Sequence, residues 1–483
     1  MTDLAVADAT EQAALVRSGA ASALELVDAA IERAEQRNPA LNAIIHERYE
    51  RARSEARDEI RAPDGPLRGV PIVVKDLDGP LADEPYHLGN RLLRALGHVA
   101  DHDSWLNARL RGAGCVVIGK TNAPELGLLP TTEPTAYGPT RNPWDPARSP
   151  GGSSGGTAAA VASGIVPLGH AGDGGGSIRI PASMCNLFGL KPTRGRVSLG
   201  PDDGQVWDGL VVRHVLTRSV RDSAAVLDVI AGPMPGDPYS AAPPAGSFLD
   251  ALGAPIGRLR IGIRTHAPAA ASAVDPACIA AAEATARMLE ELGHVVEPAW
   301  PAALDEGDLL STYLVIAATA VAHDLARISA IAGRAVEAGD VEALTWSYAE
   351  MAAAFSAADH AAALDTAHAW SRRVADWWSP ADGGSGFDLL VTPTLAALAP
   401  LLGTVDGDHP DPGATLAAAT PFAAFTLPFN ITGQPAMSLP LAMADGLPVG
   451  TQVVAPTGGE PLLLALASQL EDAHPWIGRR PPW

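Results

Sequence analysis

The chain has 483 residues, of which 47% are hydrophobic and 18% are charged, a balance that indicates a globular protein with ample chain to bury a core. Its formal net charge of −21 opposes nucleic-acid backbones and anionic lipid surfaces, so neither nucleic acid nor membrane is an expected partner. The three cysteines and thirteen histidines lack the spacings of a disulfide framework or a metal site, so we expect no metal.

The sequence also lacks signals for export or membrane insertion. Its first residues are acidic and show no basic segment followed by an apolar one, as a signal peptide would. Apolar stretches such as Leu314–Ala322 are too short to cross a bilayer. Cys115, Cys185 and Cys278 are odd in number and far apart, which favours buried, reduced thiols. These features predict a cytoplasmic protein.

Helix and strand signals alternate along the chain. Helical periodicity runs through residues 10–60, where Ser22 and Glu25 form a capping box ahead of an apolar face. Short β-branched runs then predict strands, and the stretches between them predict helices. The expected strands are Val70–Val74, Cys115–Ile118, Val166–Leu168, Leu259–Ile263, Leu389–Thr392, Ala436–Leu439 and Val449–Val454. The expected helices include Asp103–Arg111, Thr157–Ser163, Pro276–Leu292, Leu314–Ile331 and Glu342–Ala375.

This alternation favours an α/β protein with a largely buried sheet that helices cover on both faces. Two segments are candidate linkers between domains: the Pro-, Gly- and Ala-rich residues 231–256 and the Gly-rich residues 379–386. Apolar, strand-like runs resume directly after each of them. We therefore interpret both as long surface loops within a single domain over residues 1–483.

Lysine is rare in this chain and confined to one region. Lys75, Lys120 and Lys191 are the only lysines, and arginine supplies the rest of the 34 basic residues. Arginine stays protonated in a protein, whereas a buried lysine can lose its proton and act as a base. Lys75 follows the apolar run 70–74, so we interpret it as a neutral base. The alternative is an ion pair between Lys75 and Asp76 at a strand end.

A glycine-rich segment with two serines follows in the same region. Residues 149–157 read Ser-Pro-Gly-Gly-Ser-Ser-Gly-Gly-Thr and lead into a helix-like stretch. Three interpretations compete: a phosphate-binding loop, whose known motifs are absent, a nucleophile elbow at Ser154, and a serine within an active-site loop. The elbow requires a preceding strand, but residues 141–150 hold three prolines and predict coil.

A second glycine-rich segment, at 172–181, reads Gly-Asp-Gly-Gly-Gly-Ser-Ile-Arg-Ile-Pro. Consecutive N–H groups from its three adjacent glycines would stabilise the oxyanion of a tetrahedral intermediate built on Ser177. The alternative is a flexible glycine turn. The segment Gly-Leu-Lys-Pro-Thr-Arg-Gly at 189–195 predicts a turn, in which we interpret Lys191 as structural.

Together these segments resemble the amidase signature family of serine hydrolases. The matching motifs are V-V-K-D at 73–76, G-K-T-N-A-P-E at 119–125, the loop at 149–157, G-D-G-G-G-S-I-R-I-P at 172–181 and G-L-K-P-T-R-G at 189–195. The likeness is densest over about 65–230 and continues through F-N-I-T-G-Q-P-A at 429–436. The segment T-T-E-P-T-A-Y-G-P-T-R-N-P-W at 131–144 resembles the branch that contains the 6-aminohexanoate cyclic dimer hydrolases and the aryl acylamidases.

The resemblance implies the fold and a catalytic triad. The implied fold is a large mixed, mostly parallel twisted sheet covered by helices on both faces. Ser177 is the implied nucleophile, Lys75 the base, and Ser153, after a cis peptide bond, connects the two. Asp173 and Arg179 organise the loop around the nucleophile. The implied oxyanion hole consists of the backbone N–H groups of Gly174, Gly175, Gly176 and Ser177.

The implied reaction is hydrolysis of carboxylic amides, but not of protein peptide bonds, through an acyl-enzyme and without a cofactor. The implied substrates are 6-aminohexanoate oligoamides or the cyclic dimer. Aryl acylamidase or general aliphatic amidase activity is the alternative, and the net charge opposes a tRNA-linked amidotransferase subunit. We expect a small-molecule amide as the partner and leave open a homodimer. Candidates for an apolar acyl pocket, although each is more often core than pocket, are Leu126, Leu128, Leu129, Trp207 and the segment Ile316–Ala322 that begins at Ile316.

Overall fold

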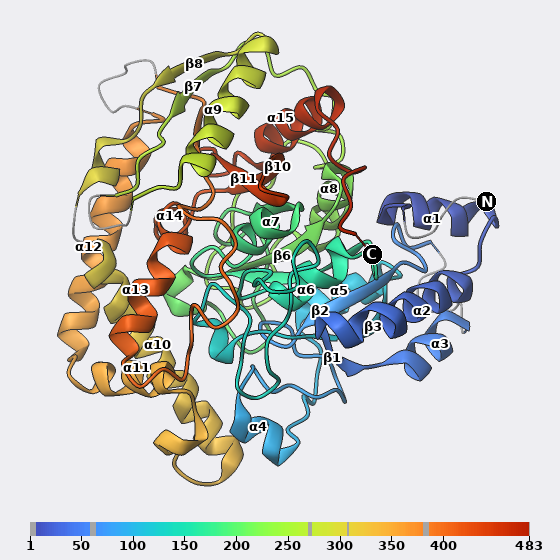
Figure 1. Cartoon of the computed structure of the whole chain (residues 1–483), viewed down its shortest axis with the longest axis vertical. Coiled ribbons are helices and arrows are strands. Elements are labelled where there is room, and N and C mark those ends of the chain that lie inside the picture. The colour runs from blue at the N-terminus through green and yellow to red at the C-terminus, as the bar shows by residue number, and fades with distance from the viewer. Residues whose placement is uncertain (1–5, 58–63, 269–272, 307–308, 380–385, 483) are drawn as a thin grey trace.

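The structure, a computed structural model, describes residues 6–57, 64–268, 273–306, 309–379 and 386–482. Its strands are β1 (Ile44–Glu47), β2 (Pro71–Lys75), β3 (Val116–Thr121), β4 (Leu168–Asp173), β5 (Phe188–Lys191), β6 (Val212–Thr217), β7 (Arg260–Ile263), β8 (Val295–Pro298), β9 (Leu389–Pro393), β10 (Ala436–Ala444) and β11 (Leu447–Val454). Within the described residues they form one eleven-stranded sheet in the order β1-β3-β2-β4-β6-β5-β10-β11-β9-β7-β8. Figure 1 shows β7 and β8 near the top of the molecule and β1, β2 and β3 in its lower half.

Helices connect these strands. They are α1 (Ala9–Ser18), α2 (Ala23–Leu41), α3 (Tyr49–Arg57), α4 (Arg91–Leu96), α5 (Trp105–Gly112), α6 (Gly155–Ala162), α7 (Arg179–Cys185), α8 (Val220–Ile230), α9 (Pro276–Glu291), α10 (Leu309–Ala332), α11 (Ala343–Ala353), α12 (Ala357–Asp376), α13 (Pro412–Ala423), α14 (Leu427–Thr432) and α15 (Glu460–Ala473). Short 3-10 turns are η1 (Glu125–Gly127), η2 (Trp207–Gly209), η3 (Ala302–Asp305) and η4 (Ala338–Asp340).

The predicted mixed α/β sheet is confirmed, but the expectation that it is mostly parallel is wrong. Among the described strands, six of the ten neighbouring pairs are antiparallel. One cause is β6. Strands β4 and β5 follow each other in the chain with α7 between them, but β6 lies between them in the sheet and is antiparallel to both. The hairpin β10–β11 adds further antiparallel pairs. A short apolar run predicts a strand but carries no signal for its direction.

Six of the seven apolar runs predicted to be strands match a strand closely, and the run at 166–168 meets β4 only at Leu168, whereas β1, β5, β6 and β8 were not predicted. The turn predicted at 189–195 is therefore wrong in its first residues, which belong to β5. The helix predicted over 342–375 is two helices, because Ser356 caps a new helix with Asp359. The capping box of Ser22 and Glu25 is confirmed, with Oγ of Ser22 accepting from the Glu25 N–H over 3.2 Å.

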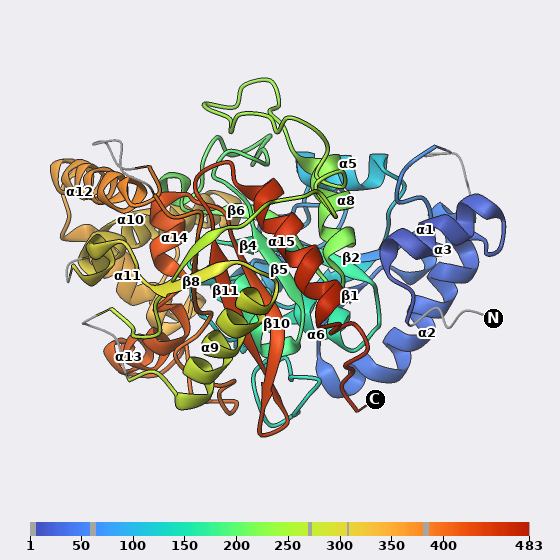
Figure 2. The same ribbon diagram turned by 90° about the horizontal axis from the view of Figure 1, so that it is seen from above.

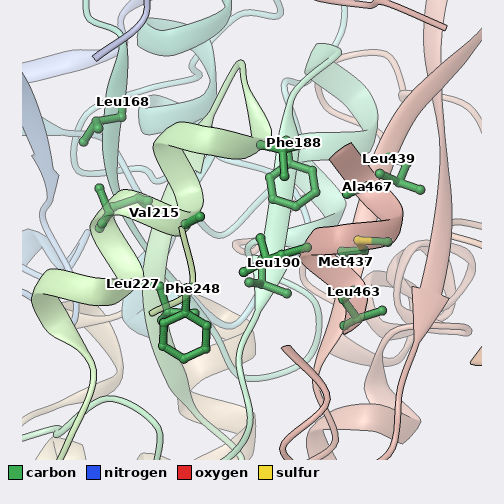
Figure 3. Close-up of a cluster of buried hydrophobic side chains, with 14 of the residues drawn as sticks. Leu168, Phe188, Leu190, Val215, Leu227, Phe248, Met437, Leu439, Leu463 and Ala467 are labelled. Atoms are coloured by element: carbon green, nitrogen blue, oxygen red, sulfur yellow. The ribbon is translucent and has the colours of Figure 1, made fainter. Parts of the chain in front are cut away.

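Helices cover both faces of the sheet. On one face α5, α8, α9 and α15 enclose the largest hydrophobic cluster. Figure 3 shows part of this cluster, where Leu190 of β5 and Met437 of β10 lie beside Leu463 of α15. On the opposite face α2, α6 and α7 pack over a second cluster. Helices α10–α13 gather at the side of the molecule opposite to α1–α3 (Figure 2).

The first of the two candidate linkers contributes a side chain to the core. Residues 231–256 are irregular, but Phe248 inserts into the main hydrophobic cluster and is only 2% exposed. Of the second segment, residues 380–385 lie outside the described residues. Burial of Phe248 therefore ties the first segment to the core.

Helix α10 corrects the expectation that the chain's apolar stretches are all short. By length and composition it is apolar enough to cross a membrane. In this structure it packs against α4, α11 and α12. Some of its apolar side chains pack in these helix contacts, and others line a large cavity.

Candidate active site

The site begins at the end of strand β2, which is buried along its whole length. Its last residue, Lys75, is fully buried, and Nζ lies 2.8 Å from Oγ of Ser153 and 3.5 Å from Oδ2 of Asp78. Burial lowers the pKa of Lys75, and the carboxylate of Asp78 opposes that effect only partly. The structure therefore places a lysine of lowered pKa in hydrogen-bond contact with a serine hydroxyl.

Ser153 lies in the glycine-rich loop that precedes α6. The peptide bond between Gly152 and Ser153 is cis, as predicted. The neighbouring Ser154 is fully buried and its hydroxyl donates a hydrogen bond to the carbonyl oxygen of Gly172. Residues 141–150, all of them described, form no strand. The interpretation of Ser154 as a nucleophile elbow is therefore wrong, because that motif needs a strand directly before the serine.

The second glycine-rich segment forms a loop between β4 and α7 that an ion pair closes. Asp173 ends β4 and Arg179 begins α7, and neither side chain is exposed. Arg179 donates to both carboxylate oxygens of Asp173, over 2.8 and 3.0 Å, and Asn430 adds a third donor at 2.8 Å. Burial raises the pKa of Asp173, but the charge and hydrogen bonds of Arg179 outweigh that effect, and the pKa is lowered to about 2. These contacts fix both ends of the loop.

Ser177 lies inside this loop and is 9% exposed. Ser153, Ser177, Gly174 and Gly175 all line one cavity. Thr426 donates a hydrogen bond to the carbonyl oxygen of Gly175 over 2.6 Å. Gly176 has a φ of +134°, and a Cβ atom at this position would clash with the side chain of Thr426. The position before Ser177 therefore requires glycine.

We predict that Arg179→Met destabilises the protein by about 3–5 kcal/mol, because it leaves the carboxylate of Asp173 buried and unpaired. The pKa of Asp173 is lowered, so its favourable contribution is complete above the ordinary aspartate pKa and is lost only as the pH falls towards 2. Urea unfolding at pH 7, followed by tryptophan fluorescence, measures the loss.

The matched control is Arg373→Met, which removes an exposed ion pair with Glu306 and should leave the urea midpoint almost unchanged, because solvent screens such a pair. Equal losses in the two variants would contradict a structural role for the buried pair.

The cavity beside the serines has a volume of about 740 Å³. The predicted pocket residues Leu126, Leu128, Leu129 and Trp207 line it. Ile316 does not: it is fully buried in a hydrophobic cluster that includes Trp370, since α12 packs against α10 there. Tyr86, Tyr313 and Tyr348 contribute aromatic side chains to the walls. The cavity is therefore a mainly apolar chamber with the serine hydroxyls at one wall.

Charged residues form another part of the cavity wall, and sequence reasoning missed them. Asp203 links two arginines: it lies 2.9 Å from Nη1 of Arg327 and 3.6 Å from Nη2 of Arg213. Asp78 and Asp324 also line the cavity, and burial raises the pKa of Asp324 to about 7. These residues come from separate strands, loops and a helix, so no local motif indicates them.

The other two lysines have structural contacts. Nζ of Lys120 lies 2.7 Å from Oδ1 of Asp76, and both side chains are buried. The alternative of an ion pair between Lys75 and Asp76 is therefore wrong, because Lys120 takes that carboxylate. Nζ of Lys191 donates to the carbonyl oxygen of Pro192 over 3.0 Å, and burial lowers its pKa to about 7.

His46, Asp76 and His87 lie close enough together to hold a metal ion, although the sequence spacing does not suggest it. Each group already has a protein partner: the Tyr137 hydroxyl contacts both imidazoles, at 3.0 Å from His46, and Lys120 binds the carboxylate. The ammonium group of Lys120 supplies the positive charge that the carboxylate of Asp76 needs.

Known proteins resemble this chain in sequence and in overall structure. The profile of the amidase family matches residues 25–464. The chain is 41% identical to a 6-aminohexanoate-cyclic-dimer hydrolase of Pseudomonas sp. (strain NK87), over 98% of this chain and 96% of that protein. A solved structure of 6-aminohexanoate cyclic dimer hydrolase superposes with a TM-score of 0.95 at 41% identity, covering 100% of this chain and 99% of the other. A bacterial aryl acylamidase structure gives 0.88 at 28% identity, covering 98% and 99%.

Proposed function

The chain belongs to the amidase family and is an amide-hydrolysing enzyme, and we propose that it works through an acyl-enzyme formed on Ser177. In this proposal Lys75 is the base and Ser153 connects it to the nucleophile. The observation that carries the proposal is the 2.8 Å contact between Nζ of Lys75 and Oγ of Ser153. Ser153 and Ser177 line the same cavity, where a substrate would reach the nucleophile. The direction of the pKa shift of Lys75 supports its role, because burial lowers that pKa and so favours the neutral amine that accepts a proton.

In the proposed reaction a proton passes from Ser177 through Ser153 to Lys75, and a proton later returns by way of Ser153. Neutral Lys75 takes the proton of Ser153 while Ser153 takes that of Ser177, and Oγ of Ser177 bonds to the amide carbon. The carbonyl π pair moves to oxygen, where the N–H groups of residues 174–177 stabilise the negative charge. The C–N bond then breaks, and Lys75 returns its proton through Ser153 to the departing nitrogen. Water hydrolyses the acyl-enzyme by the same steps and releases the acid.

We further propose that the substrate is an uncharged 6-aminohexanoate oligoamide such as the cyclic dimer. Support comes from the relatives that act on that dimer and from the apolar walls of the 740 Å³ cavity. Aryl amides are the second candidate, because Trp207, Tyr313 and Tyr348 would pack against an aromatic ring.

A substrate panel tests this proposal. The isolated chain is assayed with the cyclic dimer, the linear dimer, an aryl anilide and a simple aliphatic amide. We expect kcat/KM to be at least about tenfold higher for the cyclic dimer, a difference of roughly 1.4 kcal/mol in transition-state binding. A preference of that size for the anilide would contradict the oligoamide assignment and favour the aryl acylamidase. Failure to hydrolyse any amide without partner subunits would favour the amidotransferase alternative.

The proposal also includes the organisation of the protein. We propose that residues 1–483 form one domain that works in the cytoplasm on a small molecule, without a nucleic-acid or membrane partner. The net charge of −21 supports this assignment. Light scattering of the purified chain separates a monomer from a homodimer.

A further inference from the structure

Lys75 has a second polar neighbour besides Ser153. Oδ2 of Asp78 lies 3.5 Å from its Nζ atom, and the Asp78 side chain is only 12% exposed. The proposed reaction makes Lys75 positively charged each time it accepts a proton. A positive charge in a fully buried position is unfavourable unless an opposite charge lies beside it. Asp78 provides that opposite charge.

The fold holds the carboxylate of Asp78 against Lys75. Asp78 has a φ of +64°, a left-handed conformation that aspartate and asparagine adopt more readily than most residues. The carboxylate packs against Gly172 of β4, where any Cβ atom would clash with Oδ2 of Asp78. The turn after β2 and the missing side chain on β4 thus create the space that this carboxylate occupies.

Other titratable groups around Lys75 are bound to other residues, are neutral or make no ion pair with it. Asp173 raises the pKa of Lys75 but is bound to Arg179, and Arg213 lowers it from β6. His170 of β4 is buried, and its pKa lies well below the ordinary value, so it is neutral. Tyr86 and Asp324, which line the same cavity, make no ion pair with Lys75. Within the described part of the chain, Asp78 is therefore the carboxylate in ion-pair contact with Lys75.

We propose that Asp78 is a positioning residue that acts through Lys75, by stabilising the ammonium group formed when Lys75 accepts the proton of Ser153. This inference rests on the proposed triad and adds a fourth member to it. The Ser153 hydroxyl and the Asp78 carboxylate are then the two groups that hold Nζ of Lys75 in place.

Loss of this carboxylate has two opposite effects on activity. Activity requires neutral Lys75, so it is present above the pKa of Lys75 and falls as the pH drops through that value. An opposite charge at this distance raises a lysine pKa by about one to three units, so its removal should shift the acid limb of the pH–rate profile to lower pH by that amount. A weaker base also transfers protons less readily, so the plateau rate should fall by up to about tenfold per unit.

The test uses Asp78→Asn and Asp78→Gly, because both residues tolerate the left-handed backbone. The matched control is Asp83→Asn, the same chemical change at a φ of +61°, where the side chain is 79% exposed. The readout is the rate at which a fluorophosphonate labels Ser177 between pH 5 and 10. The rate is taken per labelled site, so it does not depend on the fraction of protein that folds.

We expect both Asp78 variants to show a lower plateau and an acid limb shifted to lower pH, with an unchanged profile for Asp83→Asn. A lower plateau with the limb in its original place would overturn the inference, because it would reduce Asp78 to a packing role. A limb shifted to higher pH would overturn it as well. Lys75→Met, run in parallel, tests the triad separately: if it labels at the normal rate, the proposed function fails whatever the Asp78 variants do.

Discussion

Replacement of Ser177 by alanine is expected to lower kcat for amide hydrolysis by on the order of 10⁴- to 10⁶-fold. The proposed acyl-enzyme forms on Oγ of Ser177, and no other cavity hydroxyl lies in the loop that the buried Asp173–Arg179 pair closes. Removal of one oxygen from a position that is 9% exposed changes packing little, so the folded structure should persist. Steady-state kinetics and a thermal melt of the same sample measure the two effects.

The matched control for Ser177→Ala is Ser154→Ala. Ser154 is also in a glycine-rich loop, but its hydroxyl is bound to the Gly172 carbonyl and it does not line the cavity. We expect this variant to keep its activity within about tenfold, because it loses one neutral hydrogen bond. Fluorophosphonate should label Ser177 in Ser154→Ala and nothing in Ser177→Ala. Labelling of Ser154 in the absence of Ser177 would restore the nucleophile-elbow interpretation.

The strands that the sequence predicts are those with uninterrupted apolar, β-branched residues. Strand β6 was missed because it carries Arg213 and His214, and charged or polar side chains within a run predict an exposed segment. Both are buried here: Arg213 reaches the Leu199 carbonyl and His214 contacts Ser223. Their hydrogen-bond partners are distant in the chain or on the next helix, and only the folded arrangement reveals them.

In the candidate site, too, some residues can be predicted from local motifs and others only from the folded structure. Ser153, Ser177 and the glycines lie in contiguous motifs, so the sequence predicts them directly. The ion pair of Lys120 with Asp76 joins β3 to the end of β2, and the charged cavity wall joins β6 to α10. Such contacts depend on strand order, which short apolar runs do not specify. The pocket prediction failed at Ile316 because α12 packs over that part of α10, and helix packing is likewise not evident from a local run of residues.

Replacement of Lys75 by methionine is expected to lower kcat by on the order of 10⁴-fold or more, because no base is then left to accept the proton of Ser153. Methionine is close to lysine in length and suits a fully buried position, so the variant should fold. Lys75→Arg should be equally inactive, since a guanidinium group does not give up its proton near neutral pH. Single-turnover assays with the cyclic dimer and an aryl anilide measure the chemical step in each variant.

The chain supplies its own control, because Lys191 is also fully buried and also has a lowered pKa. Its Nζ atom donates to a backbone carbonyl, so Lys191→Met should retain activity within about tenfold even if its stability falls. These two buried lysines would then differ in their polar neighbours: Nζ of Lys75 lies 2.8 Å from the Ser153 hydroxyl and 3.5 Å from the Asp78 carboxylate, whereas Nζ of Lys191 donates to a backbone carbonyl. Full activity in Lys75→Met, or equal losses in the two variants, would show that burial of a lysine here serves structure and not proton transfer.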